Sequence, residues 1–556
     1  MFKPSHIAFA LLATAAQAAH AQVPNAGTQL RQLPQAPALP RIEPEIDIES
    51  PAAAGDSVDV GPAIRVTTLR VTGQTAFTEA ELVQATGFVP GADLTLAGLR
   101  ALAARISDHY HASGYFLAQA YLPAQDVQSG SVTIDVIEGR YGAVEVHNAA
   151  RIADGVPESV LRGLEPGDLI ANAPLERRLL LLSDVPGVLV HATLAPGDEV
   201  GTSDLIVDLA PGPPISGSLE ADNAGSRYTG EYRFGGTINL NNPAGIGDQL
   251  SLRLLASDDG LAYGRASYQA PIGAATVGVA YSHLLYSLGR EFEALDGSGT
   301  ADIFSLYASY PLVRSRRANL YALAGADYIM LHDEIGLVST ESNKHVQEGT
   351  FGLAADWRDS LGGGGSNVAY LGWTIGSLDI RTPAVRAVDA ATARTAGTFN
   401  SVQASLARLQ SVAGPLSLYG AVRGQYAFDN LDSSEQMQLG GAYGVRAYPE
   451  GEAFGDIGYV ATAEARFALG GSRDTLPGEF ELIAFVDTGE IQYAQDPWFT
   501  GSNHATRSGY GVGLNWFGPE GFLVRTAYAR RLGTGPATSV PDDGDGHFWF
   551  QVVKLF

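Results

Sequence analysis

The stretch that decides the fold reads YRFGGTINL at residues 232–240, followed by LSLRL at residues 250–254. In both, large apolar side chains alternate with small or polar ones, so one face suits lipid and the other suits water. Similar segments recur through the rest of the chain. The sixteen segments lie at residues 216–223, 232–240, 250–254, 262–269, 277–281, 303–310, 319–330, 349–357, 367–375, 401–409, 416–426, 458–467, 480–486, 509–516, 522–529 and 547–556.

This pattern predicts that residues 212–556 form an all-β, sixteen-stranded antiparallel barrel that spans a membrane. Most segments come near the roughly 9 to 11 residues that a tilted strand needs to cross a bilayer. An even number of strands closes such a barrel and leaves no free edge. A soluble β-sandwich also has alternating strands, but an ordinary one takes only about 100 residues. We therefore expect a transmembrane barrel.

The composition argues against several classes of protein. The net charge is −25 and lysine occurs only at positions 3, 344 and 554, so a nucleic-acid partner is not expected. There is no cysteine, and therefore neither a disulfide framework nor a thiolate metal site. His109 and His111 stand two apart on a predicted helix and point in different directions, as in a solvated pair.

Enzyme motifs are also scarce. The chain has no His-Glu-x-x-His, no Gly-x-Ser-x-Gly and no phosphate-binding Gly-Lys-Ser/Thr. Scattered acidic residues leave a hydrolytic carboxylate pair open but unsupported. We expect no enzymatic activity, no catalytic residue, no cofactor and no metal.

Residues 1–21 have the features of a signal peptide. Lys3 gives a positive start, residues 7–16 are mostly apolar, and Ala19-His20-Ala21 places small residues at the cleavage site. A membrane anchor would need about 20 apolar residues, which the polar residues that follow do not allow. We expect export, with a mature start at Gln22.

Residues 22–62 are rich in proline, alanine and glutamine. A short helix is predicted at residues 26–33, and the remainder reads equally as a linker or as plain disorder.

Two small α+β modules follow, at residues 63–139 and 140–211. Each has the order strand, helix, helix, strand, strand. In the first, these elements are expected at residues 64–71, from the N-cap Thr78, 96–113, 118–123 and 131–138. In the second, they are expected at residues 143–147, 157–162, 175–183, 188–194 and 203–209.

Several short motifs in the chain resemble those of one protein family. YLPAQD at residues 121–126 and VTIDVIEG at 132–139 look like the end of a POTRA module, and DNAG at 222–225 with NPAGIGD at 242–248 looks like the opening of the family's barrel. The family is that of the outer-membrane transporters of two-partner secretion, the TpsB proteins, typified by haemolysin secretion/activation proteins. The resemblance implies two POTRA domains, a sixteen-stranded barrel and an N-terminal helix that plugs the pore.

A loop near residues 430–456 carries the most telling part of this resemblance. LGGAYGVRAY at residues 439–448 resembles the family's sixth extracellular loop, whose tip folds back into the lumen. The residues so implied are Gly440, Gly441, Val445, Arg446, Tyr448, Gly455 and Asp456. Ala447 stands where glycine is usual, which leaves the backbone shape of the tip open.

FVDTG at residues 485–489 resembles the partner motif of that loop. Alternation turns Val486 toward lipid and Asp487 toward the lumen, although Phe485 shares the inner face. We expect Arg446 to bind Asp487 as a bidentate tether, with Gly489 nearby. Without the resemblance, a mobile extracellular arginine and an unrelated carboxylate would be the simpler interpretation.

Phe556 resembles the C-terminal aromatic residue that the barrel-assembly machinery recognises, and is expected to be an assembly signal. Lys554 lies on the same face and departs from an apolar pattern, which is tolerable if its amine reaches the membrane interface.

The resemblance implies an outer-membrane translocator with its POTRA domains in the periplasm. It would secrete, or secrete and activate, a large β-helical exoprotein without nucleotide hydrolysis. Other expected partners are the barrel-assembly machinery, periplasmic chaperones and outer-membrane lipid. An assembly factor for outer-membrane proteins is the alternative; a diffusion porin and a barrel-anchored hydrolase fit the 190 residues before the barrel poorly.

Overall fold

The computed structural model describes residues 24–37, 44–48, 62–127, 129–470, 477–533, 537–540, 544 and 546–556. The expected signal peptide and its cleavage site lie outside the described residues. The chain divides into two compact units. Residues 41–213 with 244–247 form one, and the rest of the chain forms the other.

The smaller unit begins with an α+β module. Its elements are β2 (Ile64–Val66), β3 (Thr68–Thr72), α3 (Glu79–Thr86), β4 (Ala92–Leu94), α4 (Leu96–Ala112), β5 (Gln119–Tyr121) and β6 (Ser131–Ile137). β3, β6 and β5 form one sheet, and β2 pairs with β4. The expected single strand at residues 64–71 is thus two strands. The break falls at Thr67, whose N–H donates to the Gly130 carbonyl at 2.7 Å.

A second module of the same unit repeats this plan. Its elements are β7 (Arg140–Asn148), α5 (Gly155–Leu161), α6 (Asn172–Ser183), β8 (Val188–Pro196) and β9 (Thr202–Pro211). An extra strand, β1 (Glu45–Ile48), runs parallel to β8, giving the sheet order β1-β8-β9-β7. Sequence reasoning assigned these residues to a linker. Their alternation covers only four residues, which is too short a signal.

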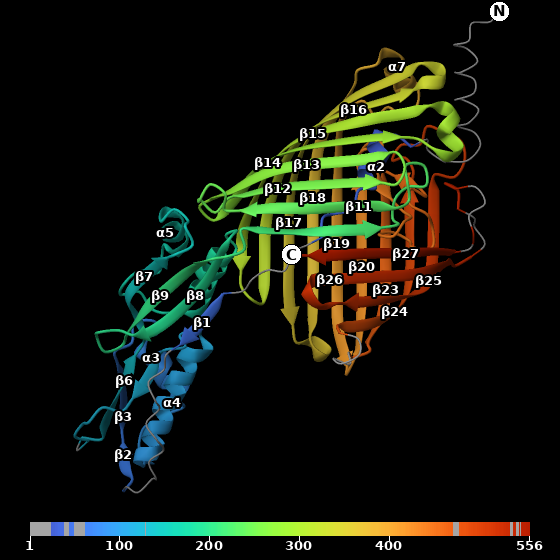
Figure 1. Ribbon diagram of the computed structural model, residues 1–556. Coiled ribbons are helices and arrows are strands. Elements are labelled where there is room, and N and C mark those ends of the chain that lie inside the picture. Colours follow the sequence, from blue (N-terminus) through green and yellow to red (C-terminus); the bar gives the residue numbers. More distant parts are fainter. Residues whose placement is uncertain are drawn as a thin grey trace, which may run out of the picture. The chain divides into compact units, whose positions relative to one another are not determined.

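Sixteen antiparallel strands close the barrel (Figure 1). They are β10 (Ile215–Asp222), β11 (Arg233–Asn241), β12 (Gln249–Ser257), β13 (Leu261–Ile272), β14 (Ala275–Ser287), β15 (Gly297–Arg314), β16 (Ala318–Ile335), β17 (Thr340–Asp359), β18 (Gly365–Ile380), β19 (Gly397–Ala413), β20 (Leu416–Ala427), β23 (Ile457–Ala468), β24 (Glu479–Gln492), β25 (His504–Phe517), β26 (Phe522–Arg531) and β27 (Gly546–Leu555). Each predicted segment overlaps one of them, so the predicted fold class is confirmed.

The outward face of the barrel is apolar, as the alternation predicted. Phe234, Leu254 and Phe351 are each more than half exposed. Large apolar side chains exposed on the outside of the barrel suit a wall that faces lipid. β15, β16 and β17 contain 18 to 20 residues and exceed the length needed to cross a bilayer. None of the described helices is long and apolar enough to cross a membrane.

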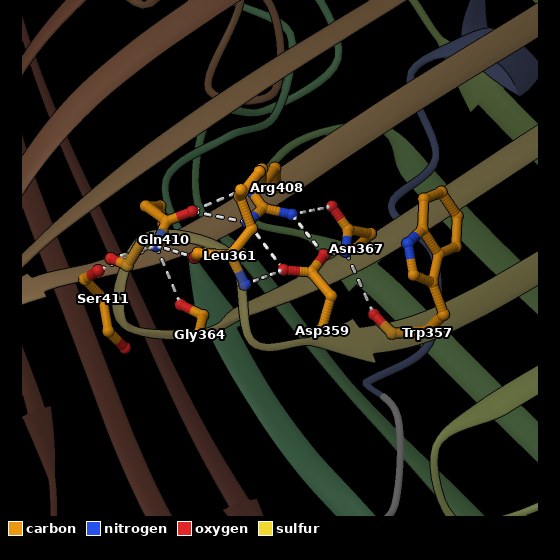
Figure 2. Close-up of polar contacts among 9 residues, drawn as sticks. Trp357, Asp359, Leu361, Gly364, Asn367, Arg408, Gln410 and Ser411 are labelled. Carbon is orange, nitrogen blue, oxygen red and sulfur yellow. Dashed lines mark hydrogen bonds and ion pairs between the residues drawn. The ribbon is translucent and has the colours of Figure 1, made fainter.

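We call the barrel end at which β10 begins the proximal end, and the opposite end the distal end. At the proximal end, side chains pin the glycine-rich turn between β17 and β18 (Figure 2). Arg408 on β19 contacts both Asp359 and Asn367 at 2.7 Å. Gln410 donates to the carbonyls of Leu361, Gly362 and Gly364. A turn whose glycines have positive φ is thus fixed by its neighbours.

Two further pieces lie with the barrel. One is the short helix α2 (Ala26–Arg31), and the other is the distal connection between β20 and β23, residues 428–456, which we call the lumen loop. The lumen loop contains a small hairpin of β21 (Met437–Gln438) and β22 (Phe454–Gly455).

Candidate functional site

The tip of the lumen loop is bound to the barrel wall through Arg446. Its Nε lies 2.8 Å from Asp487 Oδ2 and its Nη2 lies 2.8 Å from Oδ1, which is a bidentate pair. Nη1 lies 2.9 Å from Glu464 on β23. The Asp487 side chain is fully buried and the Arg446 side chain is 15% exposed. Burial alone would lower the pKa of Arg446, but Asp487 and Glu464 hold it above its ordinary value.

Aromatic residues complete the binding site of the arginine. The guanidinium carbon lies 3.5 Å from the centre of the Phe485 ring, within range of a cation–π contact. Trp549 on β27 donates its indole N–H to the Arg446 carbonyl at 2.7 Å. The sequence pattern left the inward position of Phe485 unexplained. In the structure, the Phe485 ring is part of the arginine site.

Ala447 is compatible with the tip. It is fully buried, and its φ is not positive, so this backbone does not require glycine. Room for its methyl group comes from Gly509 on β25, where a Cβ would lie 2.4 Å from that of Ala447. A glycine on the wall accommodates the alanine in the loop.

Glycines of the loop and the wall allow close backbone approach. Gly441 has φ +99°, and a Cβ there would collide with the carboxylate of Glu450. A Cβ at Gly489 on β24 would lie 2.7 Å from the Leu439 side chain. Glu450 lies in the loop, outside the membrane-spanning strands, and burial raises its pKa to about 7.

The remaining expected loop residues are also packed inside. Val445 is fully buried and Tyr448 is 3% exposed. The guanidinium carbons of Arg507 and Arg531 lie 5.2 and 5.1 Å from the centre of the Tyr448 ring. Asp456 accepts hydrogen bonds from Gln436 at 2.8 Å and from a main-chain N–H at 2.9 Å. A Cβ at Gly440 or at Gly455 would lie 2.5 Å from a main-chain oxygen. The structure brings the expected tether and loop residues together in one region.

Phe556 lies elsewhere, at the proximal end. Its main chain pairs with Gly217 through two hydrogen bonds of 2.8 and 3.0 Å, next to the β10–β27 pairing that closes the barrel. Its ring is half exposed. The Lys554 amine lies 4.6 Å from the Phe522 ring and 3.8 Å from Glu520 in a proximal turn.

Helix α2 is held by both the wall and the loop. Asn25 caps its N-terminus. The Ala26 N–H donates to Asp333 on β16 at 2.7 Å, and Thr229 donates to the buried Gln29 at 2.8 Å. At its other end, the Gln32 carbonyl accepts from Arg233 at 3.0 Å.

The helix and the lumen loop also contact each other directly. Ser433 donates to the Asn25 side chain at 2.9 Å, and Arg31 donates to the Gln436 carbonyl at 3.0 Å. A Cβ at Gly27 would lie 2.6 Å from the main-chain nitrogen of Ser434. Helix and loop therefore form one packed body.

Space remains beside this body. Residues 30–37 line a cavity of about 1050 Å³ together with Tyr370, Arg423 and Gln551 of the wall. The described residues contain no group of three or more side chains that could hold a metal ion. Helix α2 and the lumen loop are thus two separate chain segments that pack within the barrel.

Comparison with known proteins identifies the family. The model of the haemolysin secretion/activation proteins ShlB/FhaC/HecB matches residues 201–516, more than half of the chain. The chain belongs to this family. A model of the ShlB-type POTRA domain matches residues 64–139. This member of the ShlB/FhaC/HecB family is an outer-membrane transporter of two-partner secretion, and the family is one of transporters, not enzymes.

Relatives cover nearly the whole chain. The heme/hemopexin transporter protein HuxB of Haemophilus influenzae is 26% identical over 96% of this chain and 95% of its own length. The outer membrane transporter CdiB of an Escherichia coli strain is 24% identical over 88% and 86%. The solved structure of CdiB from Escherichia coli superposes with a TM-score of 0.70 at 22% identity, over 91% and 93%.

Sequence reasoning missed several residues of this site. Glu464, Trp549 and Gly509 come from three different strands, and each meets the loop only because the barrel closes. No local pattern marks such residues, although inward position on a strand is a necessary condition.

Proposed function

We propose that this transporter rests in a closed state and that α2 and the lumen loop are the two pieces that close it. Unfolded exoprotein would enter from the periplasm, which faces the proximal end, and leave through the distal end. The contact between Asn25 and Ser433 carries this proposal, since it joins the two pieces inside the lumen. Cargo can pass only when that body is displaced.

The proposal includes the domain limits expected from the sequence, with POTRA domains at residues 63–139 and 140–211. It also includes an unfolded, β-helix-forming exoprotein as the cargo. POTRA-type sheets can bind extended peptides by adding a strand at an edge. The β8 edge is already occupied by β1, so cargo that pairs there must displace β1.

Closure by tethering has a clear physical basis. A buried bidentate arginine–carboxylate pair is stronger than a surface ion pair, which typically contributes about 0–1 kcal/mol. Arg446 also bonds to Glu464, so moving the tip would separate the guanidinium from two carboxylates at once. Pairing with the wall therefore favours the resting position until cargo offers new contacts.

Expected partners in biogenesis are the barrel-assembly machinery, which would recognise Phe556, and periplasmic chaperones. HuxB is described as a heme/hemopexin transporter protein, so an exoprotein that acts on heme or hemopexin is one candidate cargo. The neighbouring open reading frame is the place to look for the exoprotein.

Gene deletion with complementation tests the function. The exoprotein should disappear from the culture supernatant when this protein is deleted and return when it is restored. Retention of full secretion in the deletion strain would refute the assignment for that cargo. Loss of other outer-membrane proteins without loss of secretion would instead favour an assembly factor.

A further inference from the structure

A second carboxylate of the lumen loop is buried as completely as Asp487. Glu452 follows the arginine tip, in the part of the loop that returns toward β23, and its side chain is fully buried. Its first partner is Arg507 on β25, whose Nε lies 2.7 Å from Oε1. This pair is separate from the Arg446 site.

The other partners of Glu452 lie in a different distal connection, between β26 and β27. The N–H and the hydroxyl of Thr538 donate to it at 3.1 Å. The N–H and the hydroxyl of Ser539 donate at 3.2 and 2.8 Å. Two successive main-chain N–H groups directed at one oxyanion form a small anion-binding nest.

The same segment is held from its other side. Tyr228, in the distal connection between β10 and β11, donates its hydroxyl to the Ser539 carbonyl. Its buried ring packs edge-on against Phe292, with centroids 4.7 Å apart. Residues 537–540 are therefore fixed between the lumen loop and a third connection.

The chemistry indicates attachment between loops. A carboxylate removed from water is costly unless it is paired and hydrogen-bonded. Its two oxygens offer about four lone-pair sites, and Arg507, Thr538 and Ser539 supply enough donors to use them. All of these donors lie outside the lumen loop, so Glu452 joins this loop to its neighbours.

We propose that Glu452 is a second anchor of the lumen loop and that residues 537–540 are a latch at the distal mouth. Arg446 holds the tip to the wall, and Glu452 holds the returning arm to the latch. Emerging cargo would have to separate Glu452 from Thr538 and Ser539. The inference rests on the proposed function for its role, although the latch itself exists without cargo.

Cysteine accessibility tests the latch, because the chain contains no native cysteine. Ala453→Cys places one reporter beside Glu452 at a position only 4% exposed. In intact cells, a membrane-impermeant maleimide should label this reporter about tenfold faster when Glu452→Gln is added. The side-chain amide keeps the shape of the carboxylate, but its NH2 group faces the N–H and O–H donors of Arg507, Thr538 and Ser539 and cannot accept from them. A tenfold change in labelling rate corresponds to about 1.4 kcal/mol.

Asp496→Asn is the matched control. It removes the same charge from an exposed pair between Arg394 and Asp496, whose side chains are 61% and 71% exposed. It should leave the labelling rate unchanged. Equal rates for Glu452→Gln and the parent would overturn the latch.

A second variant keeps the test valid if Glu452→Gln fails to insert, as judged by heat-modifiable migration. Thr538→Val with Ser539→Ala removes two hydroxyl donors from the latch and should also accelerate labelling. Glu452→Asp keeps the carboxylate, so its labelling should be slower than that of Glu452→Gln. Unchanged labelling in the double variant would likewise overturn the proposal. Labelling needs no cargo, so absence of secretion by the parent protein would refute the proposed function alone.

Discussion

Arg446 is the residue that binds the tip of the lumen loop to the barrel wall. It joins a loop to two strands through Asp487 and Glu464. Removing one partner of a buried ion pair leaves the other charge uncompensated, at a cost of about 3–5 kcal/mol. We expect Arg446→Ala to abolish secretion while barrel insertion remains largely intact.

The measurement for Arg446→Ala is exoprotein in the supernatant, with heat-modifiable migration as the check on insertion. Arg394→Ala is the control, because its ion pair with Asp496 is exposed. Full secretion by Arg446→Ala would remove the basis for a functional tether.

Gly27 is the residue that allows α2 to pack against the loop. A Cβ at this position would lie 2.6 Å from the Ser434 nitrogen, and overpacking typically costs about 1–3 kcal/mol. Gly27→Ala should therefore loosen the helix and raise the frequency of channel openings in planar bilayers. Gly420→Ala on β20 is the control, since a Cβ there meets nothing within 4 Å. Identical opening frequencies in both variants would contradict the packing argument.

At the scale of elements, β1 occupies a sheet edge to which cargo could otherwise bind. It covers the edge of β8 over four residue pairs. Replacing residues 45–48 by glycine and serine should free this edge and strengthen the binding of an extended, alternating cargo peptide several-fold. Fluorescence anisotropy with the full-length protein measures this. The same replacement at residues 198–200 should have no effect, and unchanged affinity in the β1 variant would rule out competition at this edge.

Glu138 joins elements within the smaller unit. Burial alone would raise its pKa, but hydrogen bonds from Thr75, Ala76 and Tyr110 outweigh burial and hold its pKa below the ordinary value of 4.5. A lowered carboxyl pKa stabilises the folded form above the ordinary value, and this stability is lost as the pH falls through the lowered one.

We therefore expect β3 and β6 to lose protection from hydrogen exchange below pH 4.5, after correction for the intrinsic exchange rate. Glu138→Gln should lower protection at pH 7 and weaken its dependence on pH. A variant with the same pH dependence as the parent would show that another group is responsible.

For the whole molecule, the sequence was informative wherever two environments alternate along a strand. Lipid on one side and the lumen on the other impose a period of two, and all sixteen strands were predicted from it. The strand β1 and the partners of Glu452 were not predictable in this way. Thr538 lies 86 residues from Glu452, and only the folded barrel brings the two together.

The candidate site was predictable in part for a related reason. Arg446 and Asp487 stand in short motifs that resemble a known family, and alternation gave the inward direction of Asp487. Alternation did not explain why Phe485 faces inward, because its role under the guanidinium depends on a loop from elsewhere in the chain. Contacts between distant segments carry no local sequence signal.

The central claim is that a removable body of α2 and the lumen loop closes an export channel. Single-channel conductance in planar bilayers tests it most directly, with the parent protein compared with a variant that lacks residues 22–33. We predict larger and more frequent conductance steps in the variant, because its helix no longer fills the lumen or supports the loop. Equal conductance in the two proteins would contradict the claim.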